Sequence, residues 1–187
     1  MLWVLQQALD GGVETIQLRE KDLDGRELFF LAESARNLTQ RYHARLLIND
    51  RIDLALAVDA DGVQLGKASL PIENARALLG PRKLLGASTH SLEEAAEAER
   101  NGAYFILFGP VYFTPSKAPY GAPQGLVALK KVVEKISLPI YAIGGIKPEN
   151  IADARCAGVR GVALISAVMS AADPRDAAKK ILNLLKR

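Results

Sequence analysis

The sequence has few of the residues that form covalent or metal cross-links. Its 187 residues include one cysteine, Cys156, and two histidines, His43 and His90. A single cysteine cannot form an internal disulfide, and this set is too small for a Cys/His zinc site. We therefore expect neither disulfide redox chemistry nor a structural zinc ion.

Long apolar runs and blocks of one charge are also missing. No run approaches the roughly 20 apolar residues of a membrane helix, and the start of the chain lacks the basic leader and cleavage site of a signal peptide. The 24 basic and 21 acidic residues are scattered along the chain, which argues against nucleic acid as a partner. We expect a cytoplasmic protein without a membrane or nucleic-acid partner. Its net charge of +3 suits a small anionic ligand.

The chain does contain enough apolar residues for one core. They make up 49% of the sequence, so we expect a single domain over residues 1–187. The sequence leaves open whether the protein forms a homo-oligomer.

Seven short β-rich segments alternate with helical segments. They are nearly continuous apolar runs, as in parallel strands that are buried on both faces. The expected strands lie within residues 13–19, 44–50, 61–66, 83–89, 103–109, 138–145 and 159–166.

Helix start and stop signals lie between these segments. Ser91 opens a capping box in "SLEE", Pro148 and Pro174 suit first helical positions, and Gly102 and Gly158 suit C-terminal caps. The alternation predicts an α/β fold with a parallel sheet.

Two parallel architectures fit this pattern, an open doubly wound sheet and a closed TIM (β/α)8 barrel. Polar residues follow nearly every expected strand, and only in a barrel do all strand ends meet at one mouth. We therefore predict the barrel. The pattern opens with the helical stretch "LWVLQQALDGG", so the first strand of a complete barrel is missing from this chain. The gene start is placed too late, the barrel is open on one side, or something else fills the gap.

The last two expected strands end in "IGGI" and "LISAV". Glycines let backbone N–H groups approach a ligand, and helix N-termini favour anions, so Gly144, Gly145, Ile165 and Ser166 form a candidate phosphate cradle. The alternative is that the two glycines only permit a tight turn.

The first expected strand ends in "QLREKD". Alternation along a strand points Gln17, Arg19 and Lys21 the same way, so an amide and two cations could face one ligand. The alternative is a solvated charge cluster.

The second expected strand ends in "LLIND". Asn49 and Asp50 offer oxygen ligands that suit Mg²⁺ shared with substrate phosphates. Asp50 could instead cap the helix that begins near Ile52. His90 is at least as compatible with a local turn role as with catalysis.

The segment 108–125, "FGPVYFTPSKAPYGAPQG", is too long and too stiff for a plain connection. The Thr114 and Ser116 hydroxyls can donate to phosphate oxygens, and Lys117 adds a mobile point charge.

These motifs carry a resemblance. "QLREKD", "LLINDRIDLALAVDADGVQLG", "GPVYFTPSK", "AIGGI" and "GVALISAV", in this order, resemble the thiamine phosphate synthase family and its thiazole tautomerase relatives. The resemblance implies a (β/α)8 barrel that uses Mg²⁺ to join hydroxymethylpyrimidine pyrophosphate to thiazole phosphate, giving thiamine phosphate and pyrophosphate.

The resemblance also implies a role for each site residue. Pyrophosphate would be held by Arg19, Lys21 and Asn49, the metal by Asp50, and the pyrimidine by Gln17. Lys117 and Ser88 would face the leaving pyrophosphate, so the predicted catalytic residues are Arg19, Lys21, Lys117 and Ser88. The thiazole phosphate would be bound by Thr114, Ser116, Gly145, Ile165 and Ser166.

Two positions depart from the synthase pattern, and a third departs from the pattern of the tautomerase relatives. In "QLGKASLP", Gln64 replaces a family His and Ser69 replaces the second metal-binding Asp, while Lys67 would bring a cation near the pyrophosphate. Gln64 stays a substrate-binding candidate. It looks more like the tautomerase branch, but Pro110 stands where that branch has its acid/base His. The predicted function is the synthase, and the alternatives are a thiazole tautomerase-like isomerase or a noncatalytic phosphate-ligand-binding relative.

Overall fold

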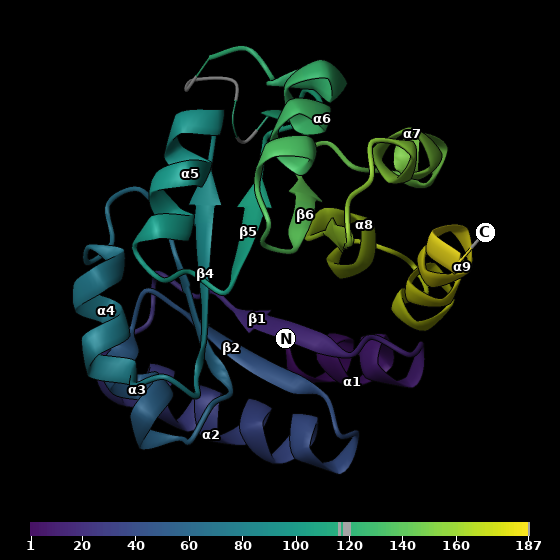
Figure 1. Ribbon diagram of the computed structural model, residues 1–187. Helices are drawn as coiled ribbons and strands as arrows, with labels where there is room; N and C mark the ends of the chain where they lie inside the picture. The colour runs from purple at the N-terminus through teal and green to yellow at the C-terminus, as the bar shows by residue number, and fades with distance from the viewer. Residues whose placement is uncertain (116, 118–120, 187) are drawn as a thin grey trace.

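The computed structural model describes residues 1–115, 117 and 121–186, in which seven parallel strands form one curved sheet, a half-barrel flanked by helices (Figure 1). The strands are β1 (Thr15–Leu18), β2 (Arg45–Asn49), β3 (Gly62–Leu65), β4 (Leu84–Thr89), β5 (Phe105–Phe108), β6 (Ile140–Ile143) and β7 (Gly161–Ala163). Each lies within its predicted range. They pair in chain order without a reversal, whereas a doubly wound sheet requires one, so that alternative is wrong.

Helices follow the strands and carry most of the predicted caps. They are α1 (Leu2–Asp10), α2 (Gly25–Arg41), α3 (Ile52–Ala57), α4 (Ile72–Leu79), α5 (Leu92–Arg100), α6 (Gly125–Lys135), the 3-10 turn η2 (Pro148–Asn150), α7 (Ile151–Cys156), α8 (Ser166–Met169) and α9 (Pro174–Lys186). Pro148 and Pro174 open their helices as predicted. Gly102 and Gly158 follow α5 and α7 with φ of +92° and +91°, the left-handed conformation expected after a helix.

The predicted capping box at α5 is only half formed. The Ser91 hydroxyl accepts a hydrogen bond from the Glu94 N–H at 3.1 Å. The Glu94 carboxylate, however, accepts from the backbone N–H of His90 at 2.7 Å, not from that of Ser91. Glu94 is therefore diverted toward the end of β4.

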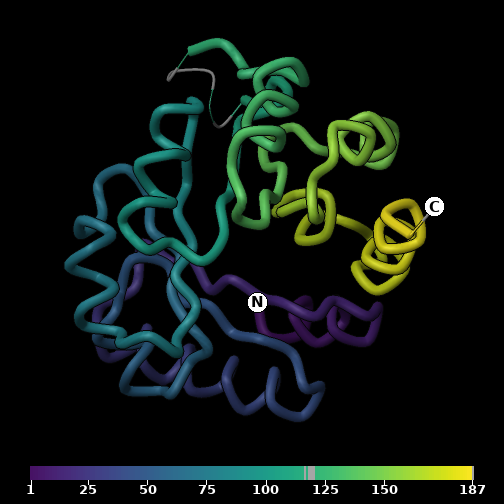
Figure 2. Tube along the Cα trace, in the orientation of Figure 1, coloured from purple at the N-terminus to yellow at the C-terminus, as the bar shows by residue number. Residues whose placement is uncertain are grey.

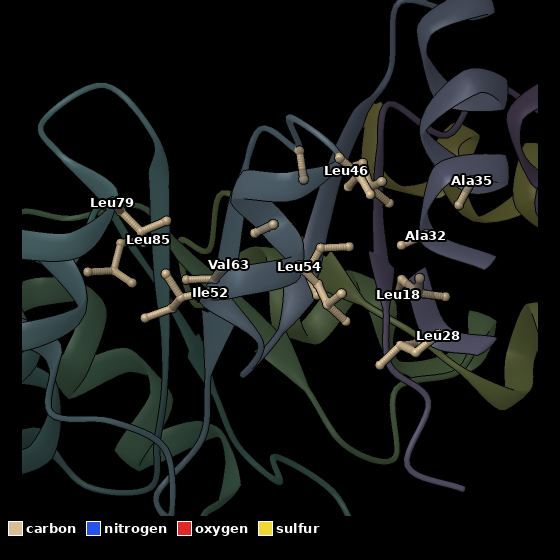
Figure 3. Packing of buried hydrophobic residues seen from close by; sticks show 14 of the residues in the cluster. Leu18, Leu28, Ala32, Ala35, Leu46, Ile52, Leu54, Val63, Leu79 and Leu85 are labelled. Atoms are coloured by element: carbon tan, nitrogen blue, oxygen red, sulfur yellow. The ribbon is translucent and has the colours of Figure 1, made fainter. Parts of the chain in front are cut away.

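The main core lies between the strands and the helices. Alternate strand residues such as Leu46 and Val63 point outward and are fully buried against α2, α3 and α4. Figure 3 shows Leu18 near Leu28 and Ala32 of α2, and Leu46 belongs to the same buried cluster. Burying a side chain of this size stabilises the fold by about 1.5–3 kcal/mol. This layer therefore holds the helices against the sheet.

The opposite face of the sheet forms the inside of the half-barrel. Leu47, Phe105 and Leu107 are buried there in a smaller apolar cluster. Gly86 leaves room for its neighbours, because a Cβ at this position would lie 2.1 Å from Gln64 Oε1 and 2.2 Å from the Phe105 ring. The interior is thus filled by side chains below a polar layer.

The amino ends of the strands are held by charged groups. The Arg36 guanidinium pairs with Asp61 at 2.7 Å, and the same carboxylate oxygen accepts from the Leu46 N–H at 2.7 Å. Arg76 donates to the backbone oxygens of Gly80, Lys83 and Gly102. These contacts tie helices and connections together at the edge away from the predicted site.

The first and last helices lie side by side, so the N-terminal and C-terminal segments meet on one flank (Figure 2). β1 and β7 stand at the two ends of the strand order, and the missing first strand stays a prediction. No helix in the described part of the chain is long and apolar enough to cross a membrane.

Candidate active site

The predicted site residues lie at the carboxyl ends of the strands. Because the strands are parallel and ordered along the chain, these ends share one edge. The described part of the connection that follows β5 lies beyond the arrowheads of β4 and β5 (Figure 1). This is the edge at which barrel enzymes hold their catalytic groups.

A hydrogen-bonded network surrounds Asp50. The Gln17 amide donates to Asn49 Oδ1 at 2.9 Å, and the Asn49 amide donates to Asp50 Oδ2 at 2.7 Å. The other carboxylate oxygen of Asp50 contacts the Ser69 hydroxyl and accepts from the Gly66 N–H at 3.3 Å. These five residues are called the Asp50 network below.

Asp50 is not the cap of α3. The N-cap position is Arg51, whose side chain makes no capping bond, and the Asp50 carboxylate turns to the β3 end instead. Asp50 is exposed and has a φ of +61°, a conformation that non-glycine residues adopt at some cost. The capping alternative is therefore wrong, and the carboxylate remains at the mouth.

Gln64 and Ser88 form a second pair. Gln64 is 1% exposed, and its amide donates to Ser88 Oγ at 3.1 Å and to the Leu65 carbonyl at 3.3 Å. Within the described residues the Gln64 Oε1 atom has no hydrogen-bond partner. Gln64 thus fixes the half-buried Ser88 hydroxyl at the end of β4.

Arg19 and Lys21 follow β1 and are exposed. In the part of the chain that the structure describes, neither side chain pairs with a carboxylate. Both cations can therefore meet an anionic ligand, and the solvated-cluster alternative stays open.

The two glycines after β6 leave space for the loop that follows β5. Gly144 and Gly145 have φ of +90° and +66°. A Cβ at Gly144 would lie 2.5 Å from Pro110 Cβ, and one at Gly145 would lie 2.6 Å from the Phe113 carbonyl oxygen. The Tyr112 N–H donates to the Gly144 carbonyl at 3.0 Å. The glycines therefore do more than permit a turn, and the phosphate cradle stays a prediction.

The other predicted residues fall on two loops. Thr114 and Lys117 line a small hollow with Pro110 and Tyr112, and the Lys117 N–H donates to the Thr114 carbonyl at 3.0 Å. Ser116 lies outside the described residues. Ile165 and Ser166 are exposed at the start of α8, after β7.

The structure brings the predicted residues together in groups. Gln17, Asn49 and Asp50 share the Asp50 network, whereas Gln64 pairs with Ser88. The β7 end, with Ile165 and Ser166, stands at the other end of the strand order from β1.

The sequence reasoning missed Glu94 as a neighbour of the site. Its carboxylate lies 3.1 Å from His90 Nδ1 and 3.7 Å from Lys67 Nζ. The helix start "SLEE" was an available signal, because a Glu in the first turn of a helix can reach back to a backbone N–H group at the start of the helix.

This arrangement defines a class, the TIM-barrel-like α/β proteins with a polar site at the carboxyl ends of their strands. Residues 1–168 match the family model described as thiamine monophosphate synthase. The chain belongs to this family.

Relatives of known name cover nearly all of the chain. A thiamine-phosphate synthase from Chlorobium phaeobacteroides is 47% identical over 179 residues, which are 96% of this chain and 87% of the relative. One from Pyrococcus abyssi is 44% identical over 181 residues, which are 97% of this chain and 86% of the relative. The solved structure of a thiamine phosphate pyrophosphorylase from Pyrococcus furiosus superposes with a TM-score of 0.92 at 42% identity, covering 99% of this chain and 89% of that one.

Proposed function

We propose that this protein is a thiamine phosphate synthase, which condenses hydroxymethylpyrimidine pyrophosphate with thiazole phosphate and releases pyrophosphate. The observation that carries the proposal is family membership over residues 1–168, together with the Asp50 network and the exposed cations of Arg19 and Lys21 at one edge of the sheet. The (β/α)8 barrel belongs to the same proposal, supported by the strand order and the Pyrococcus furiosus structure.

The residue types suit this chemistry. Departure of pyrophosphate leaves an electron-rich pyrimidine methyl cation, so catalysis consists mainly of neutralising the leaving group and positioning the thiazole nitrogen. Arg19, Lys21 and Lys117 supply positive charge, and the fixed Ser88 hydroxyl supplies a hydrogen-bond donor. A ring nitrogen can attack without a general base. This step therefore does not require a His or Glu side chain to remove a proton.

The donor set at Asp50 fits a Mg²⁺ ion that is shared with the substrate. The described residues contain no group of three or more His, Cys, Asp or Glu side chains that could hold a metal. The Asp50 network offers one carboxylate and the neutral oxygens of Asn49 and Ser69. Mg²⁺ is commonly held by one or two carboxylates plus substrate phosphates. The ion would add positive charge beside the leaving pyrophosphate.

The thiazole phosphate would lie near the loop after β5. Thr114 and Ser166 offer hydroxyls, while Gly145 and Ile165 offer backbone N–H groups near the starts of η2 and α8. Small phosphorylated substrates agree with the family. The site would place the second substrate opposite the cations of β1.

The alternative functions have less support. The relatives from Chlorobium and Pyrococcus carry synthase names. Pro110 also occupies the position of the tautomerase His, and proline cannot transfer a proton. A noncatalytic binder would bind phosphates without forming product.

The test is product formation from both substrates, with and without Mg²⁺. We expect thiamine phosphate and pyrophosphate in equal amounts. Asp50→Ala and Lys117→Ala should each lower kcat/KM by a factor of about 10²–10³, which is the usual effect of losing a group that stabilises charge in the transition state. Lys179→Ala, an exposed lysine on α9, is the matched control. A folded protein that makes no product, or equal loss in all three variants, would contradict the proposal.

A further inference from the structure

Gln64 is a polar side chain that is buried inside the half-barrel. Its carboxamide lies beside Gly86 of β4, where a Cβ would come within 2.1 Å of Oε1. A side chain at residue 86 would therefore push the carboxamide aside. Burying an amide costs free energy unless its polar atoms are hydrogen-bonded, so the contacts of its nitrogen decide what this residue can do.

The two contacts of the Gln64 nitrogen fix which way its amide faces. Nε2 lies 3.3 Å from the Leu65 carbonyl oxygen and 3.1 Å from Ser88 Oγ. A carbonyl oxygen can only accept a hydrogen bond, so the NH₂ end of the amide must face Leu65. In the reversed amide, two oxygens would face each other and the NH₂ group would take the place of Oε1, which has no partner among the described residues. Gln64 therefore donates to Ser88 Oγ.

The direction of this bond determines what the Ser88 hydroxyl can do. A serine hydroxyl has one hydrogen to donate and two lone pairs that accept. One lone pair receives the Gln64 N–H, so the hydroxyl hydrogen points elsewhere. Within the described part of the chain, Ser88 donates to no protein acceptor. The hydrogen is thus available to a ligand.

Ser88 faces the inside of the half-barrel, as Asn49 and Gln64 do. Asn49 pairs in register with Gln64, and Gln64 pairs with Gly86. Ser88 lies two residues beyond Gly86 and so points to the same face of β4. It also pairs in register with Leu107, which belongs to the apolar cluster on that face. The hydroxyl therefore lies on the inner face near the carboxyl end of β4, where the proposed function requires pyrophosphate.

We propose that Gln64 is a positioning residue, whose amide donates to Ser88 Oγ and thereby directs the Ser88 hydrogen to an oxygen of the pyrophosphate group. This inference rests on the proposed function, because pyrophosphate must occupy the site. Both side chains are neutral, so the effect needs no change of protonation. A donor that is oriented before the ligand binds costs no reorganisation during the reaction. Gln64 acts through Ser88 and not by touching pyrophosphate itself.

A double-mutant cycle separates this role from packing. Gln64→Met keeps a side chain of similar length and removes its hydrogen-bonding groups. It should weaken the binding of inorganic pyrophosphate with Mg²⁺, measured by calorimetry, about tenfold, and lower kcat/KM by a similar factor, the scale of a hydrogen bond to a charged group. Ser88→Ala should have at least this effect. In the Ser88→Ala background, Gln64→Met should change either value by less than about twofold, because no hydroxyl remains to be directed.

Thr39→Val is the matched control for the loss of a buried hydrogen bond. Thr39 is fully buried on α2, and its hydroxyl donates to the Arg36 carbonyl at 3.0 Å. Thr39→Val should leave pyrophosphate affinity and kcat/KM at wild-type values, whatever its effect on the urea midpoint. If Thr39→Val lowers both values as much as Gln64→Met does, the loss reflects stability and the inference is wrong.

NMR of the ¹⁵N-glutamine-labelled protein tests the direction of the bond itself. In Ser88→Ala, one of the two Nε2 protons of Gln64 should move to lower chemical shift, because it loses its acceptor. The Gln17 amide, which donates to Asn49, is the internal reference and should not move. If both Gln64 protons keep their shifts, Gln64 is not the donor and the inference is wrong. This comparison decides the matter if Gln64→Met does not fold.

The outcomes separate this inference from the proposed function. If the wild type forms thiamine phosphate while the effects of Gln64→Met and Ser88→Ala are additive, the inference is wrong and the synthase proposal is unaffected. If pyrophosphate binds with the expected coupling but no thiamine phosphate forms, the positioning role holds and the synthase proposal fails. If pyrophosphate does not bind and no thiamine phosphate forms, both proposals fail.

Discussion

Ser69 sets the charge beside Asp50. Its hydroxyl contacts the Asp50 carboxylate, where the family pattern described above has a second carboxylate. One negative charge attracts a free divalent ion less than two, because affinity follows the charge of the ligands. The Mg²⁺ ion proposed above would therefore enter this site together with its phosphate ligand.

A second carboxylate at residue 69 should strengthen metal binding. Ser69→Asp should bind Mn²⁺, a substitute for Mg²⁺, about tenfold more tightly in the absence of substrate, as the second carboxylate raises ligand charge. Electron paramagnetic resonance of free Mn²⁺ measures this affinity. Ser69→Ala is the control without added charge. Equal affinity in Ser69→Asp and Ser69→Ala would refute the role given to Ser69.

Gly144 packs closely against Pro110 in the loop that follows β5. Gly144→Ala and Gly80→Ala both place a side chain at positive φ, which costs about 1–3 kcal/mol. Only the Gly144 Cβ would meet Pro110, whereas nothing lies within 4 Å of a Cβ at Gly80. Urea unfolding should therefore show the larger loss of unfolding free energy for Gly144→Ala. A larger loss for Gly80→Ala would contradict the packing role of Gly144.

At the scale of elements, the N-terminus of α2 has a complete capping box. The Asp24 carboxylate accepts from the Arg26 and Glu27 N–H groups at 2.9 Å, and the Glu27 carboxylate accepts from the Asp24 N–H at 3.3 Å. Asp24→Ala should lower the unfolding free energy by about 1 kcal/mol, measured by thermal denaturation. Asp22→Ala, exposed in the preceding connection, should change it little. Equal effects would show that the loss is one of charge and not of the cap.

The sequence predicted the elements better than the contacts at their ends. Continuous apolar runs identified all seven strands, because both faces of the sheet are buried. Capping signals were less decisive, since a carboxylate near a helix start can bind several N–H groups. Asp50 turned to Gly66, and Glu94 turned to His90. The partner of Asp50 comes from the turn after β3, which helix-start signals do not reveal. The partner of Glu94 is local, but the capping pattern predicted the N–H of Ser91 instead of that of His90.

At the scale of the whole molecule, contacts between α1 and α9 join the two ends of the helix layer. Ile181 of α9 is 5% exposed in the core that it shares with α7. Ile181→Ala should lower the unfolding free energy by about 2–5 kcal/mol, through lost burial and a cavity. Lys180→Ala, one residue away, removes only a surface ion pair with Asp176 and should change the unfolding free energy little. Similar urea midpoints for both variants would contradict this placement of α9 in the core.

The general location of the candidate site was also predictable from the sequence, because parallel strands bring their carboxyl ends to one edge. The pairing of Gln17 with Asn49 and of Gln64 with Ser88 was not. It depends on strand register and on the space left by Gly86.

The polar contacts at the amino ends of the strands bear on how this protein can evolve. The Arg36–Asp61 ion pair and the hydrogen bonds from Arg76 to backbone oxygens stabilise one edge of the sheet, while the Asp50 network occupies the other. A replacement that alters the chemistry at one edge leaves the anchoring contacts of the other intact. Selection can therefore explore new ligands at the mouth while compensating changes accumulate at the far end of the same strands.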